Sequence, residues 1–211
     1  MIKAAYCNIE ELDLLRGIKL VSDDRKLKIS RFRFDKDKKL SCGAYLLLMK
    51  LLNEENVINP IFKTQKYGKA YISNYENIHF NLSHSGKYVA CAISDNKVGI
   101  DIEYNDPIID LNIAKNYFYN EEYTNIMNSA NPSNEFFKYW VLKESYMKYT
   151  GLGFNLELNS FQININNEDI TIRPPVNNIN FSLFDIDEYK LAVANRNKIS
   201  KCKEYIINEL Y

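Results

Sequence analysis

A predicted helix that leads into a group of short strands occurs twice along the chain, and this repeat restricts the folds open to it. In the first half, a strand and a short amphipathic stretch are expected over residues 1–22, followed by a helix over residues 24–53 that ends in the apolar run AYLLLMKLL. Short runs rich in β-branched or aromatic residues then predict strands at 71–72, 79–82, 88–94 and 98–103. The first half therefore predicts a helix leading into a sheet.

The second half follows the same order. It predicts helices over residues 112–128 and 132–149, and then strands at 160–165, 170–172, 181–185 and 189–194. The best internal match sets YVACAIS, starting at Tyr88, beside YKLAVAN, starting at Tyr189. Many core strands have this composition, so the match alone leaves a duplication open. Because no Pro/Gly/Ser-rich linker divides the halves, we expect them to pack together.

Composition and motif searches exclude several classes of protein. The chain has 27 Lys and Arg against 27 Asp and Glu, so its zero net charge gives no general attraction to nucleic acid or anionic lipid. No apolar stretch approaches the ~18 residues of a membrane span. Carboxylates at Glu10 and Glu11 precede any apolar signal region, so a cytoplasmic protein is expected. Neither a dinucleotide-binding G-x-G-x-x-G nor a P-loop occurs, and neither the cysteines nor the two histidines are spaced as metal ligands.

Two carboxylates share one face of the predicted strand VGIDIE. Side chains alternate along a strand, so Asp101 and Glu103 point to one side while Ile100 and Ile102 point to the other. Like charges this close are costly unless a cation lies between them, and Mg²⁺ is a hard ion that binds carboxylate oxygens. For an isolated pair the alternative, a solvent-facing edge of an amphipathic strand, would be preferred.

A carboxylate and an ammonium continue the apolar face of the predicted helix at 132–149. One helical stripe contains Phe137, Val141, Glu144 and Lys148, within and just before the segment WVLKESYMK. These two charges are therefore expected at the edge of a core, where they could serve a site. The alternative is an exposed Glu–Lys pair worth about 0.2–0.5 kcal/mol, but such pairs usually lie opposite the aromatic face.

Groups that bind phosphate gather at two places in the first half. The segment FNLSHSGKY offers the hydroxyl of Ser83, the imidazole of His84 and turn amides, although a hairpin turn selected for its conformation would have similar residues. The segment from Arg25 to Lys39 holds eight cations and two aspartates, on what we expect to be one solvated helix face. It could hold a polyanion, and the zero net charge of the whole chain makes nucleic acid the weaker choice.

The order of these segments resembles that of a known family. FNLSHSG, then VGIDIE about a dozen residues later, then WVLKESYMKYTGLG about forty residues further on, is similar to the pattern of the 4′-phosphopantetheinyl transferases. YGKA precedes FNLSHSG at the spacing of the long, monomeric, surfactin-synthetase-activating type. The resemblance implies an α+β fold of two similar α/β subdomains related by a pseudo-twofold, with coenzyme A in the cleft between them. We place these subdomains at residues 1–102 and 103–211.

The resemblance also implies the metal ligands, and the chemistry of the transfer requires a general base. Asp101, Glu103 and Glu144 resemble the family's Mg²⁺ ligands. A substrate hydroxyl needs a base, and Glu144 is the first choice because it comes from a different element than the strand pair. Glu122, in the Glu-Glu-Tyr stretch, is the second choice.

Other positions resemble the family's coenzyme A contacts. Lys148 resembles its diphosphate-binding lysine, and Ser83 and His84 resemble its phosphate contacts. The pocket would be completed by Arg25, Lys28, Ser41 and Lys69. The family often has Lys and Thr where this chain has Arg25 and Ser41, and YGKP where it has YGKA; charge and hydroxyl are kept, so only details of the pocket differ.

The activity implied is Mg²⁺-dependent transfer of 4′-phosphopantetheine from coenzyme A to a serine of an apo acyl or peptidyl carrier protein, with release of 3′,5′-ADP, in fatty acid, polyketide or nonribosomal peptide biosynthesis. A monomeric cytoplasmic enzyme without nucleic acid or membrane partners is expected. Two alternatives are a non-catalytic module that binds coenzyme A or another phosphorylated ligand, and a nuclease- or polymerase-like Mg²⁺ enzyme. Three carboxylates at a phosphate site argue against the first, and the zero net charge argues against the second.

Overall fold

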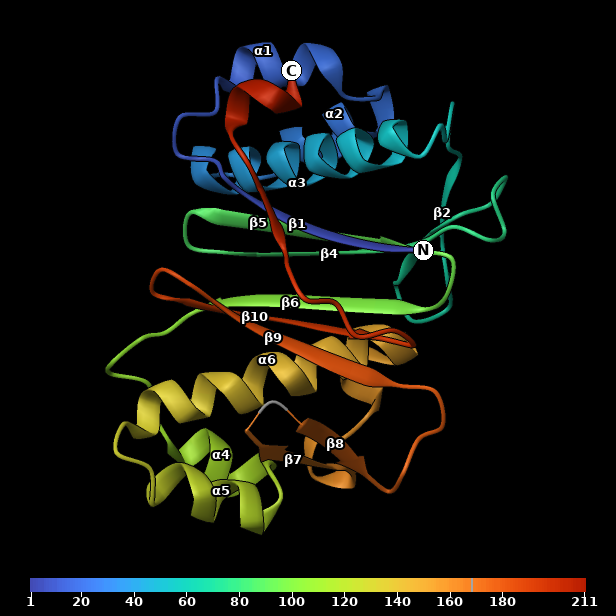
Figure 1. Ribbon diagram of the computed structural model, residues 1–211. Coiled ribbons are helices and arrows are strands. Elements are labelled where there is room, and N and C mark those ends of the chain that lie inside the picture. Colours follow the sequence, from blue (N-terminus) through green and yellow to red (C-terminus); the bar gives the residue numbers. More distant parts are fainter. Residues whose placement is uncertain (168) are drawn as a thin grey trace.

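Two β-sheets pack face to face between two long helices in the computed structural model, which describes residues 1–167 and 169–211 (Figure 1). The first half of the chain contains β1 (Ile2–Asn8), α1 (Leu14–Leu20), α2 (Asp23–Ser30), α3 (Asp35–Glu54), β2 (Phe62–Thr64), β3 (Ala70–Ile72), β4 (His79–Ser85) and β5 (Tyr88–Ser94). The second half contains β6 (Val98–Tyr104), α4 (Asn112–Tyr117), α5 (Asn120–Met127), α6 (Pro132–Thr150), β7 (Gln162–Asn166), β8 (Asp169–Arg173), β9 (Asn180–Ile186) and β10 (Tyr189–Asn195). The 3-10 helices η1 (Gly153–Asn155), η2 (Leu158–Ser160) and η3 (Ile207–Leu210) and the strand β11 (Lys203–Tyr205) complete the described elements.

Each half forms its own sheet, in the same order of elements. β5 lies between β1 and β4 in the first sheet, β10 lies between β6 and β9 in the second, and all four pairs are antiparallel. In each half a first strand is followed by helices, a small hairpin and a closing hairpin. The internal match of the sequence falls on β5 and β10, the two central strands. The predicted α+β fold of two similar subdomains is therefore confirmed.

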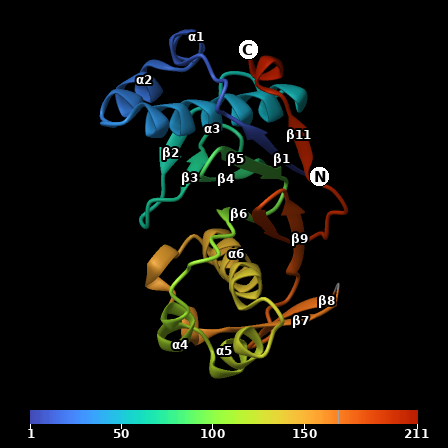
Figure 2. The ribbon, with the colours of Figure 1, turned by 90° about the vertical axis from the view of Figure 1, so that its left-hand side faces the viewer.

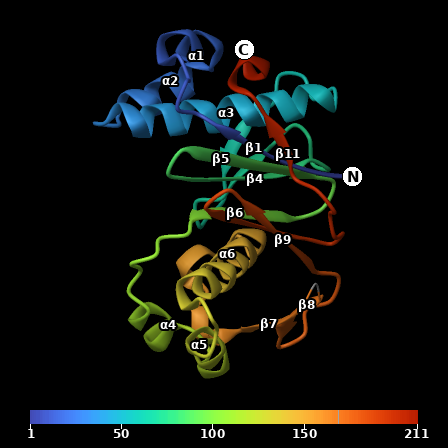
Figure 3. The same ribbon diagram turned by 60° about the vertical axis from the view of Figure 1, so that its left-hand side comes forward.

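The sheets do not follow the expected division between residues 102 and 103. That point lies inside β6, which pairs along its whole length with β10 of the second half. The C-terminal segment returns in the other direction, where β11 pairs in parallel with β1 (Figure 3). β6 is the counterpart of β1 and begins the second unit, although it follows the closing hairpin of the first unit after a few residues.

Three apolar layers hold the four structural layers together. α3 and α6 cover the outer faces of the two sheets, as the view in Figure 2 shows. Leu47 of α3 and Ile93 of β5 belong to the first outer core, and Leu142 of α6 belongs to the second. The core between the sheets includes Ala90 and Val193. Because both faces of each central strand are covered, every residue of β5 and β10 is buried.

Two of the predicted helices are interrupted. Residues 24–53 form α2 and α3 with a break at residues 31–34, and residues 112–128 form α4 and α5 with a break at residues 118–119. Ile29 and Leu40 face the same core on either side of the first break, so the apolar pattern continues where the helix does not. The basic segment expected on one helix face is thus divided between two helices and their linker. Among the described residues, no helix is long and apolar enough to cross a membrane.

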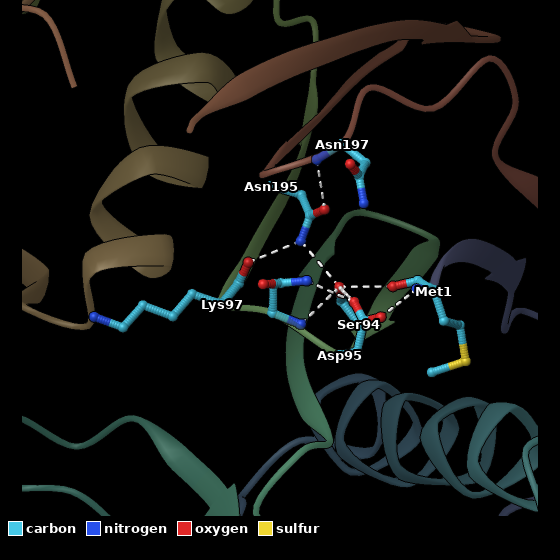
Figure 4. Close-up of polar contacts among 7 residues, drawn as sticks. Met1, Ser94, Asp95, Lys97, Asn195 and Asn197 are labelled. Carbon is cyan, nitrogen blue, oxygen red and sulfur yellow. Dashed lines mark hydrogen bonds and ion pairs between the residues drawn. The ribbon is translucent and has the colours of Figure 1, made fainter. Parts of the chain in front are cut away.

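A polar network closes the interface between the sheets at one end of the central strands (Figure 4). The last residue of β10, Asn195, donates from Nδ2 to Ser94 Oγ at 3.1 Å and to Lys97 O at 2.8 Å. Ser94, the last residue of β5, donates to Met1 O at 2.9 Å, and the amino group of Met1 pairs with Asp95. Ser94 and Asn195 are fully buried, so these bonds satisfy polar groups that water does not reach.

The approach of α6 to β6 depends on Gly99. A Cβ atom at this position would lie 1.9 Å from Ser145 O and 2.5 Å from Tyr149 N, both backbone atoms of α6.

We expect Gly99→Ala to lower the free energy of unfolding by about 3 kcal/mol or more, measured by urea denaturation. Gly68→Ala is the control, because Gly68 has φ +91° with open space around it, and should cost only about 1 kcal/mol. Equal losses would contradict the close packing.

Candidate active site

The predicted site lies along the seam where β4 of the first sheet runs beside β6 of the second. The two strands belong to different sheets, and side chains at every second position of β4 bond to β6: Asn81, Ser83 and Ser85. Ser83 Oγ donates to Asp101 Oδ1 at 2.8 Å, and Ser85 Oγ donates to Glu103 Oε2 at 2.7 Å. The shared face predicted for Asp101 and Glu103 is thus confirmed, and hydroxyl groups of the other half meet it.

α6 supplies the third side of the seam. Lys148 Nζ, in the last turn of this helix, donates to Asp101 Oδ1 at 2.6 Å and to Ser83 Oγ at 2.9 Å. Asp101 is only 2% exposed, so this ion pair lies largely out of water. Phe137 and Val141 are buried on the predicted stripe, with Glu144 and Lys148 half-buried at its end. Lys148 therefore reaches across to β6 and is not the exposed helix pair considered as the alternative.

The pKa values of the two glutamates at the seam are raised. Burial and the charge of Asp101 raise the pKa of Glu103 to about 7, and the same two causes raise the pKa of Glu144 to about 6. Two buried carboxylate oxygens, Asp101 Oδ2 and Glu144 Oε1, have no hydrogen-bond partner. A hard divalent cation would satisfy both oxygens and offset the negative charge, so the donor chemistry fits Mg²⁺.

The three carboxylates are not assembled around one point. Among residues 1–167 and 169–211, no three Asp, Glu, His or Cys side chains are placed so that they could hold a metal ion together. Lys148 is bonded to Asp101 Oδ1. The three-ligand set implied by the sequence would therefore require side-chain movement at the seam.

A pocket of about 340 Å³ opens between the halves beside Lys148. Lys28, the YGKA loop and β4 line it from the first half, and the end of α6 lines it from the second. Three glycines also line it: Gly68, Gly151 and Gly153. Lys28, Lys69 and Lys148 were all predicted to bind coenzyme A, and the structure brings them to this pocket.

Further cations lie near the pocket. Arg25 Nη1 is 3.5 Å from Ser41 Oγ, and the guanidinium lies over the ring of Tyr45 at 4.9 Å. Partial loss of water and the charge of Arg25 lower the pKa of Lys28. His84 is exposed next to Ser83, and partial loss of water followed by the charge of Lys148 lowers its pKa. Because Lys28 lines the pocket, an anion bound there would relieve the repulsion between Lys28 and Arg25.

Lys69 has a role that the sequence did not indicate. Its ammonium donates to Val98 O at 2.9 Å and also bonds to Lys148 O and Tyr149 O. Carbonyl groups at a helix C-terminus lack partners within the helix, so Lys69 caps α6 from the first half of the chain. Burial lowers its pKa to about 8. Lys69 lines the pocket as expected, but its ammonium is already bonded.

Glu122 lies apart from the seam, in the core beneath α6. It is fully buried, forms an ion pair with Lys143 at 2.8 Å and accepts hydrogen bonds from the backbone of Tyr119 and Ile163. This position does not fit the second choice of general base, because a carboxylate without exposed surface cannot reach a substrate hydroxyl. Lys143 is the partner that sequence reasoning missed. Lys143 directly precedes Glu144 on a helix, so its side chain points to another face. This spacing was the signal in the sequence that Lys143 does not belong to the stripe of Glu144 and Lys148.

Known proteins match both halves of the chain. The family model "4′-phosphopantetheinyl transferase, N-terminal" covers residues 10–96, and the model "4′-phosphopantetheinyl transferase superfamily" covers residues 97–194. The 4′-phosphopantetheinyl transferase Sfp of Bacillus subtilis (strain 168) is 30% identical over 85% of this chain and 84% of its own length. The transferase gsp of Aneurinibacillus migulanus is 38% identical over 72% of this chain and 65% of its own. A solved holo-[acyl-carrier-protein] synthase of Thermotoga maritima overlaps 46% of this chain and 61% of that chain, with 19% identity and a TM-score of 0.41.

The fold joins two related α/β units, and residues of both units meet at the seam. The chain belongs to the 4′-phosphopantetheinyl transferase superfamily. It is a transferase that moves the phosphopantetheine group to carrier proteins, and the family predicted from the motifs is confirmed. The two family models meet between residues 96 and 97, immediately before β6, where the second sheet begins.

The raised pKa of Glu103 predicts a pH-dependent stability. Its folded value of about 7 exceeds its ordinary value of 4.5, so the folded protein keeps a proton that the unfolded chain releases between these pH values. The proton on Glu103 makes its full contribution to the free energy of unfolding below about pH 4.5, and this contribution is lost as the pH rises through about 7. Glu103→Gln does not ionise, so at pH 8 with EDTA it should unfold at a higher free energy than wild type, by about 1–3 kcal/mol.

Urea titrations from pH 4.5 to 8 would measure this difference, which should disappear at the acid end. Exposed Glu157→Gln controls for the loss of a negative charge as such. A gain that is the same at every pH would contradict the shifted pKa of Glu103.

Proposed function

We propose that this protein transfers 4′-phosphopantetheine from coenzyme A to a serine hydroxyl of an apo acyl or peptidyl carrier protein, with Mg²⁺ at the seam and 3′,5′-ADP as the product. The main observation in support is the meeting of opposite charges at the seam. Lys148 pairs with Asp101 and also lines a pocket together with Lys28 and Lys69, and Asp101 and Glu144 each have a buried carboxylate oxygen without a partner. Both coenzyme A, which is anionic, and a divalent cation have matching partners there.

The metal is assigned to Asp101, Glu103 and Glu144. Asp101 Oδ2 and Glu144 Oε1 are buried oxygens without a hydrogen-bond partner, and Glu103 lies on the same face of β6 as Asp101. Mg²⁺ held there would neutralise the coenzyme A diphosphate and polarise the phosphoryl oxygen during displacement. Lys148 would hold the diphosphate and stabilise the charge of the departing 3′,5′-ADP, because its ammonium already lies between the carboxylates and the pocket.

Glu144 is the proposed general base for the carrier serine. It projects from α6, so it can face an incoming hydroxyl from a different side than the β6 pair. Its pKa of about 6 keeps it ionised near neutral pH while leaving it a competent proton acceptor. The carboxylate would take the serine proton as the oxygen attacks the phosphorus on the pantetheine side of the diphosphate.

The phosphate-binding groups of the first half are assigned to coenzyme A. Lys28, on the pocket wall, and Arg25 beside it would bind the 3′-phosphate together with His84 and Ser41. Ser83 already bonds to Lys148 and would place its hydroxyl near the diphosphate. Lys69 would contribute to coenzyme A binding indirectly, because its bond to Lys148 O holds the YGKA loop against the C-terminal end of α6. A monomeric state, a cytoplasmic location and the absence of nucleic acid or membrane partners stay predictions from the sequence.

The proposed base and metal role of Glu144 can be tested by Glu144→Gln. The substitution keeps the shape but removes the charge, so transfer to an apo-carrier should fall about 100-fold or more with little change in melting temperature. Mass spectrometry of the carrier, with coenzyme A and Mg²⁺, measures the product directly. Glu135→Gln is the matched control, because Glu135 lies on the same helix and pairs with Lys138. Activity of Glu144→Gln within about threefold of wild type would remove Glu144 from both roles.

The 3′-phosphate assignment can be tested with two ligands. Charge-assisted bonds to phosphate are worth about 1.5–3 kcal/mol, so Lys28→Ala should bind coenzyme A roughly ten- to a hundredfold more weakly. Dephospho-coenzyme A lacks the 3′-phosphate and should bind the variant and the wild type about equally. Isothermal titration gives the four affinities, and Lys26→Ala on the same helix is the control because Lys26 pairs with Asp23. An unchanged ratio between the ligands would remove Lys28 from the 3′-phosphate site.

A further inference from the structure

The hairpin turns of the two halves hold each other through a pair of tyrosines. Tyr88 and Tyr189 are the first residues of the central strands β5 and β10. Tyr88 OH donates to Asp187 Oδ2 in the β9–β10 turn at 2.6 Å, and Tyr189 OH accepts from Lys87 N in the β4–β5 turn at 3.1 Å. The two rings meet edge to face at 4.9 Å. We call these four residues the tyrosine clasp.

Tyr189 lies directly against the backbone of the β4–β5 turn. A Cβ atom on Gly86 would be 2.0 Å from Tyr189 OH and 2.9 Å from Tyr189 Cζ. Gly86 also has φ +55°, in the left-handed region that favours glycine. The shape of this turn is thus fitted to one side chain of the second half, and no larger residue at Gly86 leaves room for that side chain.

The same turn carries the residue that holds Glu103. Ser85, directly before Gly86, donates to Glu103 Oε2 at 2.7 Å and accepts a hydrogen bond from Tyr104 N at 3.1 Å. Tyr189 also packs on the ring of Tyr104, at 5.3 Å. One tyrosine therefore contacts both the turn that follows Ser85 and the strand that carries Glu103.

We propose that Tyr189 is a positioning residue, which sets the β4–β5 turn against β6 so that Ser85 orients the Glu103 carboxylate toward the metal. This inference rests on the metal assignment of the proposed function. The polar network of Ser94 and Asn195 holds the opposite ends of the same central strands, so loosening the clasp should act on the turn and leave the two sheets joined.

A double-mutant cycle tests the contact. Gly86→Ala should push Tyr189 and the turn apart and weaken the binding of Mn²⁺, measured by electron paramagnetic resonance with coenzyme A present, by about tenfold or more, the equivalent of one lost hydrogen bond to a charged group. Tyr189→Phe alone should change this affinity by less than about threefold, because the ring remains. Combining the two should restore much of the loss, because the atom closest to the added methyl group is removed.

Controls separate the turn from the whole fold. Gly153→Ala has the same φ, +55°, with open space around it, and gives the cost of backbone strain alone in urea denaturation. Tyr88→Phe removes the other hydroxyl of the clasp and should leave Mn²⁺ affinity unchanged, since Gly86 does not contact it. Amide hydrogen exchange at Lys87 should accelerate in Tyr189→Phe and not in Tyr88→Phe.

Three outcomes would overturn the proposal: Mn²⁺ affinity unchanged in Gly86→Ala, a double mutant no better than Gly86→Ala, or unchanged exchange at Lys87 in Tyr189→Phe. A wild-type protein that binds no Mn²⁺ would instead contradict the metal assignment of the proposed function. The exchange experiment needs no metal, so it would still report whether Tyr189 holds the turn.

Discussion

The ion pair between Lys148 and Asp101 lies at the seam where the two halves of the molecule meet and where the chemistry is expected. It connects α6 to β6, and through Ser83 it also connects both to β4 of the first sheet. Strands paired within one sheet are joined by backbone hydrogen bonds. β4 and β6 belong to different sheets, and along the seam hydroxyl and ammonium groups bond to carboxylates instead. Side-chain bonds of this kind contribute about 1 kcal/mol each, and somewhat more with charged partners. Side chains at the seam can therefore change partners, because the free energy of ligand binding can offset the loss of these bonds.

The duplicated fold explains why this exchange stays local. Both faces of each central strand are covered, so β5 and β10 are buried from end to end and mostly apolar. Asp101 and Glu103 follow Gly99 at every second position of β6, and Gly99 lets the last turns of α6, which carry Lys148, approach the strand. The rigid layers fix the backbone positions of Asp101 and Lys148, and only the side chains need to move.

Sequence patterns predicted which face each site residue occupies, but not its partner. The two-residue period placed Asp101 and Glu103 together, and the helical stripe placed Lys148 at the edge of a core. Periodicity describes one element at a time, whereas the Lys148–Asp101 bond and the cap that Lys69 forms on α6 join segments far apart in the chain. The same limit applies to the fold. The apolar pattern continues across the break before α3, so periodicity does not reveal that the helix ends there. β6 joins a sheet whose other strands come about eighty residues later, and periodicity does not reveal this pairing either.

The charges of the seam do not balance within the protein. Asp101, Glu103 and Glu144 lie close enough for Asp101 to raise the pKa of both glutamates, and Lys148 is the ammonium paired with this group. Near neutral pH such a group must either keep a proton on Glu103 or take up further positive charge. A divalent cation offsets more charge than a proton, and it can bond to the two buried oxygens that lack partners. These charges support the metal proposed for this seam, and a metal bound there would free Lys148 for an anionic substrate.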